Sequence, residues 1–582
     1  MSHESTSGGD LVAEVLHQRG VRFLFTLCGG HISPILVAAK KKGIRVIDVR
    51  DEVTAVFAAD AVARLTGIPG VAAVTAGPGV TNTITAVYNA RMAESPLIVL
   101  GGATATVLKG RGSLQDIDQM AMIRPAVKAA HTSRSVRALV TKLEESFDTA
   151  QDGVPGPVFV ECPVDLLYDE KTVREWYAKE GGKGDDLGSK AIRLYLKQHL
   201  FRQFYGADGV RPSLPEAANV PTPGAREIDR VVAALEKASQ PVLVVGSQTM
   251  LRALAADDIA AAVKRLGIPV FLGGMARGLL GAKDPIQFRH ARGKALKAAD
   301  LVIVCGFPMD FRLGYGQGIN RNATVITVNR DRAALSKNRA PTFGVQSDAG
   351  LFLERLSEKF TAGSGRWEPW FGTLRESEAQ RDAEIEKQAA ERVEGFVNPI
   401  HLAQEIEKAV APDGIFVVDG GDVVATASYV VRPRGPLAWL DPGVFGTLGV
   451  GAGFALAAGL CRPGREVWLI YGDGACGYSL MELDSFVRHN VPVIAVIGNN
   501  GSWAQIARDQ IEILKDDVGT PLVRNDYHKV AEGWGAKGLL LDDANKVAET
   551  LAEAKRLFAL GHPVVINCQI KDTEFRKGSM SM

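Results

Sequence analysis

The feature that most constrains this chain is an alternation, nearly from end to end, of short apolar runs with helical stretches. This order is typical of α/β proteins, because a strand that runs parallel to its neighbour needs a crossover, usually a helix, to return to the same edge. The 582 residues leave room for several domains of ordinary size. We therefore predict an α/β fold built from three doubly wound parallel-sheet domains.

Each predicted domain shows its own set of apolar strands. In the first, strands are predicted at residues 21–27, 45–49, 71–75, 96–100 and 157–162. In the second, they are predicted at residues 241–246, 269–272, 301–305 and 324–328. In the third, they are predicted at residues 415–419, 466–471, 492–498 and 563–570.

Two segments interrupt the alternation and indicate linkers. Residues 171–225 are rich in Gly, Lys, Pro and Asp around one helical stretch at 191–205, which is typical of a linker with a docking helix. Residues 363–394 contain the charged stretch 376–394, which predicts a second linker formed by a solvated helix. The predicted domains are then residues 9–170, 226–362 and 395–572.

Composition excludes several classes of protein. With 67 basic and 66 acidic residues the net charge is +1, which argues against the basic surface of a nucleic-acid binder. No apolar run approaches the roughly 18 residues of a membrane span, and the first ten residues resemble no secretory signal. The 6 scattered cysteines are typical of buried thiols in a reducing compartment. We expect a cytoplasmic protein that binds neither nucleic acid nor membrane.

The strongest chemical signal is Gly472-Asp473-Gly474, which Asn499-Asn500 follows one predicted helix and strand later. The aspartate stands at the carboxyl end of a predicted strand, where ligands bind in open α/β sheets. One carboxylate, one amide oxygen and one backbone carbonyl form an incomplete oxygen shell. Such a shell suits Mg²⁺, which completes its coordination with phosphate oxygens and water. A plain glycine-rich β-turn is the alternative interpretation.

This segment resembles the signature of thiamine diphosphate-dependent enzymes, and other motifs agree with it. The resemblance covers essentially residues 9–572, in the order pyrimidine domain, central domain, diphosphate domain. Within the family the chain is similar to acetolactate synthases and closer to 2-hydroxyacyl-CoA lyases. The segments that match the family are Arg50-Asp51-Glu52-Val53, Gly77-Pro78-Gly79-Val80-Thr81-Asn82 and Gly446-Thr447-Leu448-Gly449. The closer likeness to the lyases rests on Gly29-Gly30-His31-Ile32-Ser33-Pro34, Gly273-Gly274-Met275-Ala276-Arg277-Gly278 and Asp419-Gly420-Gly421-Asp422.

The resemblance implies how the cofactor and its metal are held. Glu52 would contact the pyrimidine ring, and a carboxyl group there promotes the imino tautomer that deprotonates the thiazolium ring. The side chains of Asp473 and Asn500 and the carbonyl of Ser502 would bind Mg²⁺. For Glu52 alone, a simple preference for the positive end of a helix is the alternative.

The resemblance also implies groups that shape the cofactor and face the substrate. Leu448 would press the thiazolium ring over the pyrimidine ring, and the Gly446 carbonyl would accept from the 4′-amino group. His31 and Gln115 would face the thiazolium ring as catalytic groups. Further cofactor contacts are implied at Gly29, Gly30, Asn82, Gly421, Asp422, Gly472, Gly474 and Ala475.

The central domain offers a second candidate site. The segment from Gly306 to Arg312 follows a predicted strand and resembles the part of relatives that binds the ADP moiety of FAD or coenzyme A. Arg330 follows the next strand, where an arginine accommodates a phosphorylated ribose. Because coenzyme A carries a 3′-phosphate and FAD does not, Arg330 favours coenzyme A. Two surface loops without a ligand are the alternative.

Together these motifs predict an enzyme that makes or breaks a carbon–carbon bond beside a carbonyl. The leading hypothesis is a 2-hydroxyacyl-CoA lyase that yields an aldehyde and formyl-CoA. An acetolactate synthase, acting on 2-oxo acids, and a non-catalytic regulatory paralogue are the alternatives; Leu114 stands where acetolactate synthases have an aromatic residue. In relatives the pyrimidine and diphosphate domains at one cofactor come from different chains, so we expect a homodimer or homotetramer.

Overall fold

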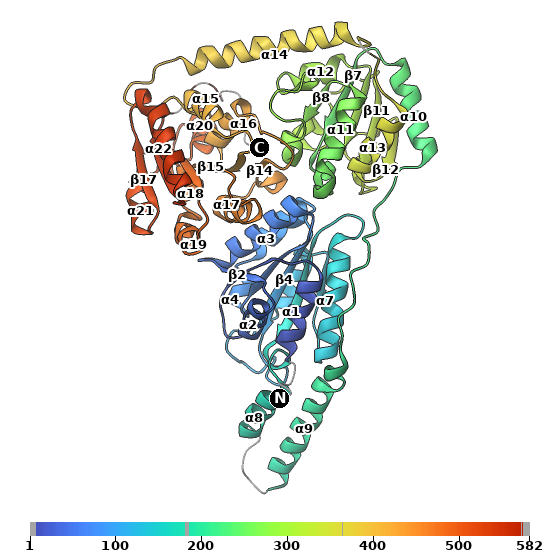
Figure 1. Cartoon of the computed structure of the whole chain (residues 1–582), viewed down its shortest axis with the longest axis vertical. Helices are drawn as coiled ribbons and strands as arrows, with labels where there is room; N and C mark the ends of the chain where they lie inside the picture. The colour runs from blue at the N-terminus through green and yellow to red at the C-terminus, as the bar shows by residue number, and fades with distance from the viewer. Residues whose placement is uncertain (1–6, 181–185, 364, 572, 574, 576–582) are drawn as a thin grey trace. The chain divides into compact units, whose positions relative to one another are not determined.

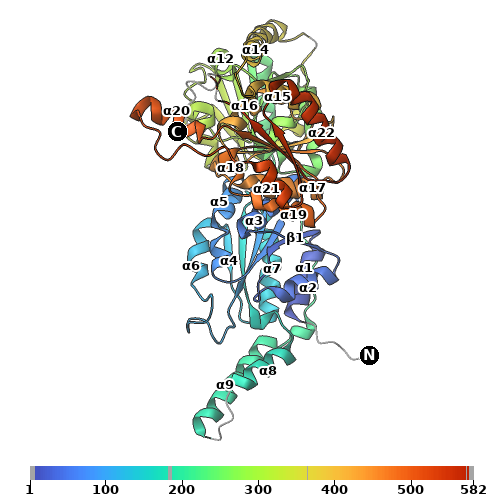
Figure 2. The ribbon, with the colours of Figure 1, turned by 90° about the vertical axis from the view of Figure 1, so that its left-hand side faces the viewer.

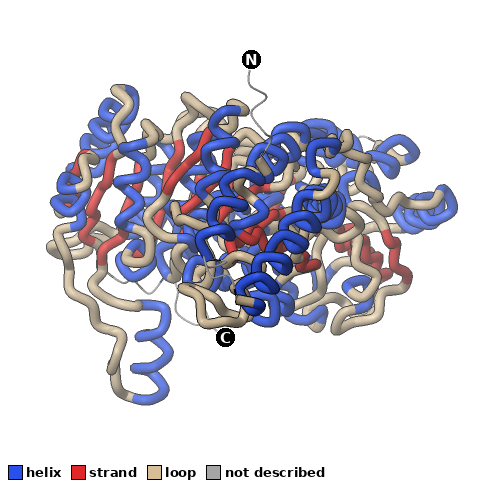
Figure 3. Tube along the Cα trace, turned by 90° about the horizontal axis from the view of Figure 1, so that it is seen from below, coloured by secondary structure: helices blue, strands red, loops and turns tan. Residues whose placement is uncertain are grey.

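The computed structural model describes residues 7–180, 186–363, 365–571, 573 and 575. Their strands form three six-stranded sheets, and helices flank the strands (Figure 3). The chain divides into two compact units, one of residues 1–63 and 68–219 and the other of residues 64–67 and 220–582. The predicted α/β class with three parallel sheets is confirmed, while the predicted domain boundaries stay a prediction.

The first unit contains one sheet, with strand order β2-β1-β3-β4-β6-β5. Its strands are β1 Phe23–Leu27, β2 Arg45–Asp48, β3 Gly70–Val74, β4 Leu97–Ala103, β5 Ala129–His131 and β6 Pro157–Pro163. Its helices are α1 Gly8–Gln18, α2 Ser33–Lys41, α3 Glu52–Thr66, α4 Pro78–Thr81, α5 Ile84–Met92, α6 Gln119–Ile123, α7 Val136–Gln151, α8 Glu170–Glu180 and α9 Leu187–Phe204. Helices α5 and α6 lie on one side of the sheet and α1 and α2 on the other, while α9 extends away from it (Figure 2).

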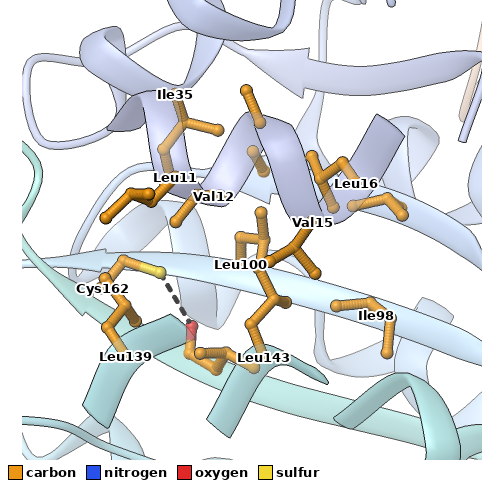
Figure 4. Packing of buried hydrophobic residues seen from close by; sticks show 14 of the residues in the cluster. Leu11, Val12, Val15, Leu16, Ile35, Ile98, Leu100, Leu139, Leu143 and Cys162 are labelled. Atoms are coloured by element: carbon orange, nitrogen blue, oxygen red, sulfur yellow. Dashed lines mark hydrogen bonds between the residues drawn. The ribbon is translucent and has the colours of Figure 1, made fainter. Parts of the chain in front are cut away.

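An apolar cluster packs helices α1, α2 and α7 against one face of this sheet (Figure 4). Residues three and four apart on a helix share a face, which is why Val12, Val15 and Leu16 of α1 are all buried. Leu100 of β4 and Leu143 of α7 belong to the same cluster. This packing fixes the carboxyl ends of the strands, from which the candidate site loops start.

The second unit contains two sheets, with orders β12-β11-β10-β7-β8-β9 and β14-β13-β15-β16-β18-β17. The central strands are β7 Pro241–Val245, β8 Val270–Leu272, β9 Gln287–Phe288, β10 Leu301–Cys305, β11 Thr324–Asn329 and β12 Phe343–Gln346. The C-terminal strands are β13 Ile415–Asp419, β14 Trp439–Leu440, β15 Val467–Gly472, β16 Ile494–Asn499, β17 Lys537–Leu541 and β18 Val564–Gln569. The C-terminal sheet therefore repeats the order of the first sheet, whereas the central sheet has the order typical of dinucleotide-binding folds.

The helices of the second unit flank these two sheets (Figure 1). Around the central sheet they are α10 Ala225–Lys237, α11 Ala256–Leu266, α12 Arg292–Ala298 and α13 Ala349–Lys359. The C-terminal part has α15 Pro399–Ala409, α16 Asp422–Val430, α17 Val450–Cys461, α18 Asp473–Cys476, α19 Leu483–Arg488, α20 Ala504–Leu514, α21 Tyr527–Gly533 and α22 Val547–Ala559. Helix α14, Glu368–Ala389, joins the central and C-terminal parts.

Three expectations need correction. The charged linker helix is α14, but it is not simply solvated, because Trp370, Phe371 and Ile385 are buried along it. Helix α8 lies in a segment for which no helix was predicted. Cys28 is exposed at the end of β1, whereas the other five cysteines are buried as predicted.

Within the described ranges, no helix combines the length and apolar character needed to cross a bilayer. The first six residues, which form part of the segment compared with a secretory signal, lie outside those ranges.

Candidate functional site

The loops after β1 and β3 meet where the first sheet changes direction. The chain continues from β1 to β2 on one side and from β3 to β4 on the other. Such a switch point leaves a crevice beyond the carboxyl ends of the strands, which is the usual ligand site of a doubly wound sheet. Residues 29–31 follow β1 and residues 77–82 follow β3, so both motifs are placed at this crevice.

Glu52, the first residue of α3, is buried beside the second of these loops. It is 7% exposed, and the Asn82 side chain donates from Nδ2 to Glu52 Oε2 over 3.0 Å. A carbon added to Gly79 would approach Glu52 Oε1 to 3.4 Å. Among the described residues Oε1 accepts no hydrogen bond, so this buried carboxyl group has one oxygen left for a ligand nitrogen.

His31 and Gln115 lie near the same loops. His31 Nδ1 lies 3.2 Å from Thr75 Oγ1, and burial lowers the pKa of the imidazole, so the ring is neutral at pH 7 and can accept a proton. Gln115 has a φ of +63°, rare for a residue with a side chain, and a carbon on Gly77 would lie 2.7 Å from its carbonyl oxygen. Within the described part of the chain, no hydrogen bond joins His31 or Gln115 to Glu52.

Asp473 lies directly after β15, which has the place in the C-terminal sheet that β3 has in the first, beside the switch between β13 and β15. It is 3% exposed and accepts from the backbone N–H groups of Gly474 at 3.0 Å and Gly501 at 2.7 Å. Burial raises the pKa of its carboxyl group, and these backbone hydrogen bonds oppose that shift. No described basic side chain forms an ion pair with it.

The two halves of the Gly472-Asp473-Gly474 and Asn499-Asn500 motif are in contact. The Gly501 N–H that binds Asp473 belongs to the loop after β16, in which Asn500 Oδ1 accepts from Ser502 N–H at 3.2 Å. A carbon added to Gly474 would lie 2.4 Å from the Trp503 ring, so only glycine fits there. A carbon on Gly420 would lie 2.7 Å from Ala475, which places the loop after β13 beside the motif.

These residues fit a magnesium ion and a diphosphate group. Asp473 is a buried carboxylate whose charge no basic side chain in the described structure balances, and carbons added to Gly472 or Gly446 would meet no atom within 4 Å. The described residues contain no group of three or more His, Cys, Asp and Glu side chains that could hold a metal. A metal at this place would therefore bind Asp473 with neutral oxygens, such as Asn500 Oδ1 and the Ser502 carbonyl, and with phosphate.

Asp422 begins α16 immediately after Gly421, where a negative charge would repel a diphosphate. Its carboxylate forms an ion pair with Arg508, which neutralises that charge. Leu448 is half-buried in the loop between Gly446 and Gly449, which have φ values of +67° and +91°. The structure thus leaves the expected cofactor contacts around Gly421 and Leu448 compatible with their predicted roles.

Sequence reasoning assigned no role to Asp419, although the segment that contains it is one of the matching motifs. This residue is fully buried at the end of β13 and accepts from the N–H groups of Gly449 at 3.0 Å and Gly451 at 2.9 Å. Burial raises the pKa of its carboxyl group to about 7. Asp419 therefore holds the loop that carries Leu448, and an aspartate at a strand end was the available signal.

Sequence reasoning also assigned no role to Gln119. It is buried, accepts from Gly77 N–H at 3.3 Å and donates to the Gly102 carbonyl at 2.9 Å. It thereby fixes the turn that leads to Asn82. Nothing in the local sequence distinguishes it from a surface glutamine on a short helix.

The two arginines predicted to bind a nucleotide both have internal partners. Arg330 is 4% exposed and donates to Asp348 from Nε at 2.9 Å and Nη2 at 2.7 Å. Arg312 donates from Nη2 to Asp310 at 2.6 Å and lies 4.2 Å over the Phe307 ring. Because Asp348 is itself fully buried, separating Arg330 from it would leave an unpaired buried charge.

Comparison with known proteins covers nearly the whole chain. Residues 6–122 match the N-terminal TPP-binding domain of thiamine pyrophosphate enzymes, residues 228–356 the central domain and residues 419–568 the C-terminal TPP-binding domain. The solved structure of a thiamine diphosphate-dependent 4-hydroxybenzoylformate decarboxylase from Rhodococcus jostii is similar, with a TM-score of 0.78, 21% identity, and coverage of 98% of this chain and 100% of that one. At that identity the likeness concerns the fold.

Curated relatives are more similar in sequence. 2-Hydroxyacyl-CoA lyase 2 of Danio rerio is 49% identical, covering 99% of this chain and 93% of its own length. The protein of the same name from Homo sapiens is 48% identical, covering 99% and 92%. An acetolactate synthase large subunit from Mycobacterium tuberculosis is 34% identical, covering 97% and 96%.

Proposed function

Because this chain belongs to the thiamine pyrophosphate enzyme family, we propose that it is a lyase that cleaves 2-hydroxyacyl-CoA thioesters into an aldehyde and formyl-CoA. The observation that carries this proposal is the 49% identity, over 99% of the chain, to 2-hydroxyacyl-CoA lyase 2. Acetolactate formation is the second candidate, since an acetolactate synthase subunit is 34% identical. Exposed Leu114, in the place of an aromatic residue, favours the lyase.

The proposed reaction breaks the bond between C1 and C2 of the substrate. The 2-hydroxyl group loses its proton as its carbon becomes the aldehyde, and C1 gains a proton to become the formyl group. Thiamine diphosphate, when bound, supplies the electron sink for this cleavage. Glu52 would share a proton with the pyrimidine ring, and neutral His31 would accept the hydroxyl proton, with Gln115 orienting the carbonyl.

The same proposal includes the metal, the assembly and the location. Asp473, Asn500 and Ser502 would hold Mg²⁺, for which the unbalanced buried carboxylate of Asp473 is the support. We propose a homodimer or homotetramer, which light scattering of the purified protein tests through its molar mass. Six free thiols support a reducing compartment, and we propose the cytoplasm.

In the deciding experiment, the purified chain is supplied with thiamine diphosphate and Mg²⁺ and is assayed separately with a 2-hydroxyacyl-CoA and with pyruvate. We expect aldehyde and formyl-CoA in equal amounts, measured by mass spectrometry. Acetolactate from pyruvate without cleavage of the thioester would replace the lyase assignment with the second candidate. The Asp473→Ala variant should lose either activity, which excludes a contaminating enzyme.

A further inference from the structure

A cavity of about 630 Å³ opens within the second unit, between the central and C-terminal sheets. Its walls come from residues 287–294, from α14 and from the last turn of α16. A volume of this size lies in the range of small-molecule sites in proteins. Phe271, Phe288 and Tyr429 contribute aromatic rings to the lining.

The lining is strongly cationic. It includes Arg277, Arg289, Arg292, Lys294 and Arg381 but a single acidic residue, Glu384, which pairs with Arg381 at 2.8 Å. Among the described residues, none of the first four lies within 4.0 Å of an acidic oxygen as an ion pair. The lining therefore carries a positive charge that its own side chains do not balance.

Burial and mutual repulsion both disfavour the charged form of these arginines. Burial, followed by the nearby charges of Arg432 and Arg277, lowers the pKa of Arg289 to about 10. Burial also lowers the pKa of Arg292, as do Arg277 and Arg312. A bound anion would relieve this repulsion, so the arrangement favours negatively charged ligands.

The arginines differ in what they already bind. Arg289 donates to carbonyls at the end of α16, among them Val431 at 2.8 Å, and so has a structural partner set. Arg277 donates from Nη1 to the Ser428 carbonyl at 3.1 Å, but its buried Nε has no hydrogen-bond acceptor in the described structure. Arg292 donates from Nη2 to the Arg312 carbonyl. Arg277 and Arg292 thus retain N–H donors beside the cavity.

Helix α16 relates the cavity to the proposed diphosphate loop. The helix starts at Asp422, directly after Gly421, and its ninth residue, Val430, precedes the cavity residue Val431. Nine helical residues span roughly 13 Å. An extended pantetheine chain reaches over that separation.

We propose that this cavity binds the phosphorylated adenosine end of the coenzyme A thioester, with Arg277, Arg292 and Lys294 as phosphate contacts. The inference rests on the proposed lyase function and assigns its substrate's nucleotide to a site other than Arg312 and Arg330, whose guanidinium groups are paired with Asp310 and Asp348. A free adenine nucleotide shares the same chemistry, and the experiment separates the two sources.

The test uses the full-length holoenzyme and the variants Arg292→Gln and Lys294→Gln; Lys294 is exposed, so its replacement does not threaten folding. We expect the KM for a 2-hydroxyacyl-CoA to rise roughly ten- to a hundred-fold in Arg292→Gln, with kcat little changed, because a remote phosphate contact binds ground and transition states alike. The rise in Lys294→Gln should be smaller. The KM for the matching pantetheine thioester, which lacks the nucleotide, should not move. Arg355→Gln, on the exposed face of α13, is the control.

A direct measurement of coenzyme A binding tests this inference independently of the lyase proposal. Calorimetry should show coenzyme A binding the wild-type protein and binding Arg292→Gln ten-fold or more weakly. If that holds without any thioester cleavage, the lyase proposal fails and the cavity assignment stands. If thioesters are cleaved with the same KM in both variants, the cavity assignment is wrong. ADP that binds there without competing with the thioester would overturn it in favour of a free nucleotide.

Discussion

The first and C-terminal sheets have the same strand order but carry different chemistry at the same place in it. Beside the switch point of the first sheet the buried carboxyl group is Glu52, which starts α3 after β2 and is bound by the side chain of Asn82 from the loop after β3. At the switch point of the C-terminal sheet it is Asp473, bound by backbone N–H groups. Topology thus sets where a ligand can bind, and the loops decide whether the site suits a ring nitrogen or a metal ion.

The largest effect should come from removing the carboxylate of the C-terminal switch point. In Asp473→Ala, Mg²⁺-dependent binding of thiamine diphosphate should be lost, because no other charged side chain belongs to the proposed shell. Calorimetry of the purified variant with cofactor and Mg²⁺ measures this. Asp526→Ala, at an exposed aspartate of the same sheet's loops, is the control and should bind normally. Equal affinity in Asp473→Ala would mean that the metal lies elsewhere.

The carboxyl group of the first switch point should affect turnover rather than binding. In Glu52→Gln we expect kcat to fall roughly 10²- to 10⁴-fold, the usual range for losing a group that transfers a proton. The cofactor affinity, from the same calorimetry, should stay within a few-fold. Glu14→Gln, at an ion-paired residue of α1, should keep full activity. A Glu52→Gln enzyme with wild-type kcat would remove the proposed division between the two sheets.

A smaller effect concerns how the stability of the folded protein changes with pH, which should depend on Asp419 of the C-terminal sheet. The pKa of Asp419 is about 7 in the folded protein and about 3.9 in an unfolded chain, so the folded state retains a proton between these values. Stability from this group therefore decreases as pH rises from about 4 to about 7, by up to about 1.4 kcal/mol per pH unit. Buried Tyr471 and Cys476 lie close enough to interact electrostatically with the same carboxylate.

The Asp419→Asn variant tests this pH dependence. Its amide oxygen can still accept from the N–H groups of Gly449 and Gly451 but does not titrate. The urea midpoint of the apoprotein should then change less between pH 5 and pH 8 than that of the wild type. An identical change in both proteins would show that Asp419 is already ionised at pH 5.

The sequence predicts those parts of the fold that depend on local residue patterns. The interior strands β10 and β15 are apolar runs bounded by turn residues, and Gly472-Asp473-Gly474 is a compact motif. The edge strands β9 and β14 have two residues each, which is too short for any periodic signal. Their place depends on the neighbouring strands rather than on their own residues.

The unpredicted parts of the candidate site depend on distant contacts. Asp419 acts on Gly449, thirty residues later, and Gln119 acts on Gly77, forty-two residues earlier. Arg330 has a carboxylate partner eighteen residues away, so its position after a strand suggested a ligand where the structure has an ion pair. Residue type and spacing do not encode such pairings, because they follow from how strands assemble.

The position of β18 also governs the order in which the C-terminal sheet can form. This strand, residues 564–569, lies between β16 and β17, although it follows both in the chain. During synthesis, β17 has no neighbour in the sheet until β18 leaves the ribosome, and the sheet beneath the Asp473 loop stays incomplete until then. A nascent chain that pauses before residue 564 would therefore leave β16 with one open edge and β17 unpaired, and open strand edges favour misassembly and chaperone binding.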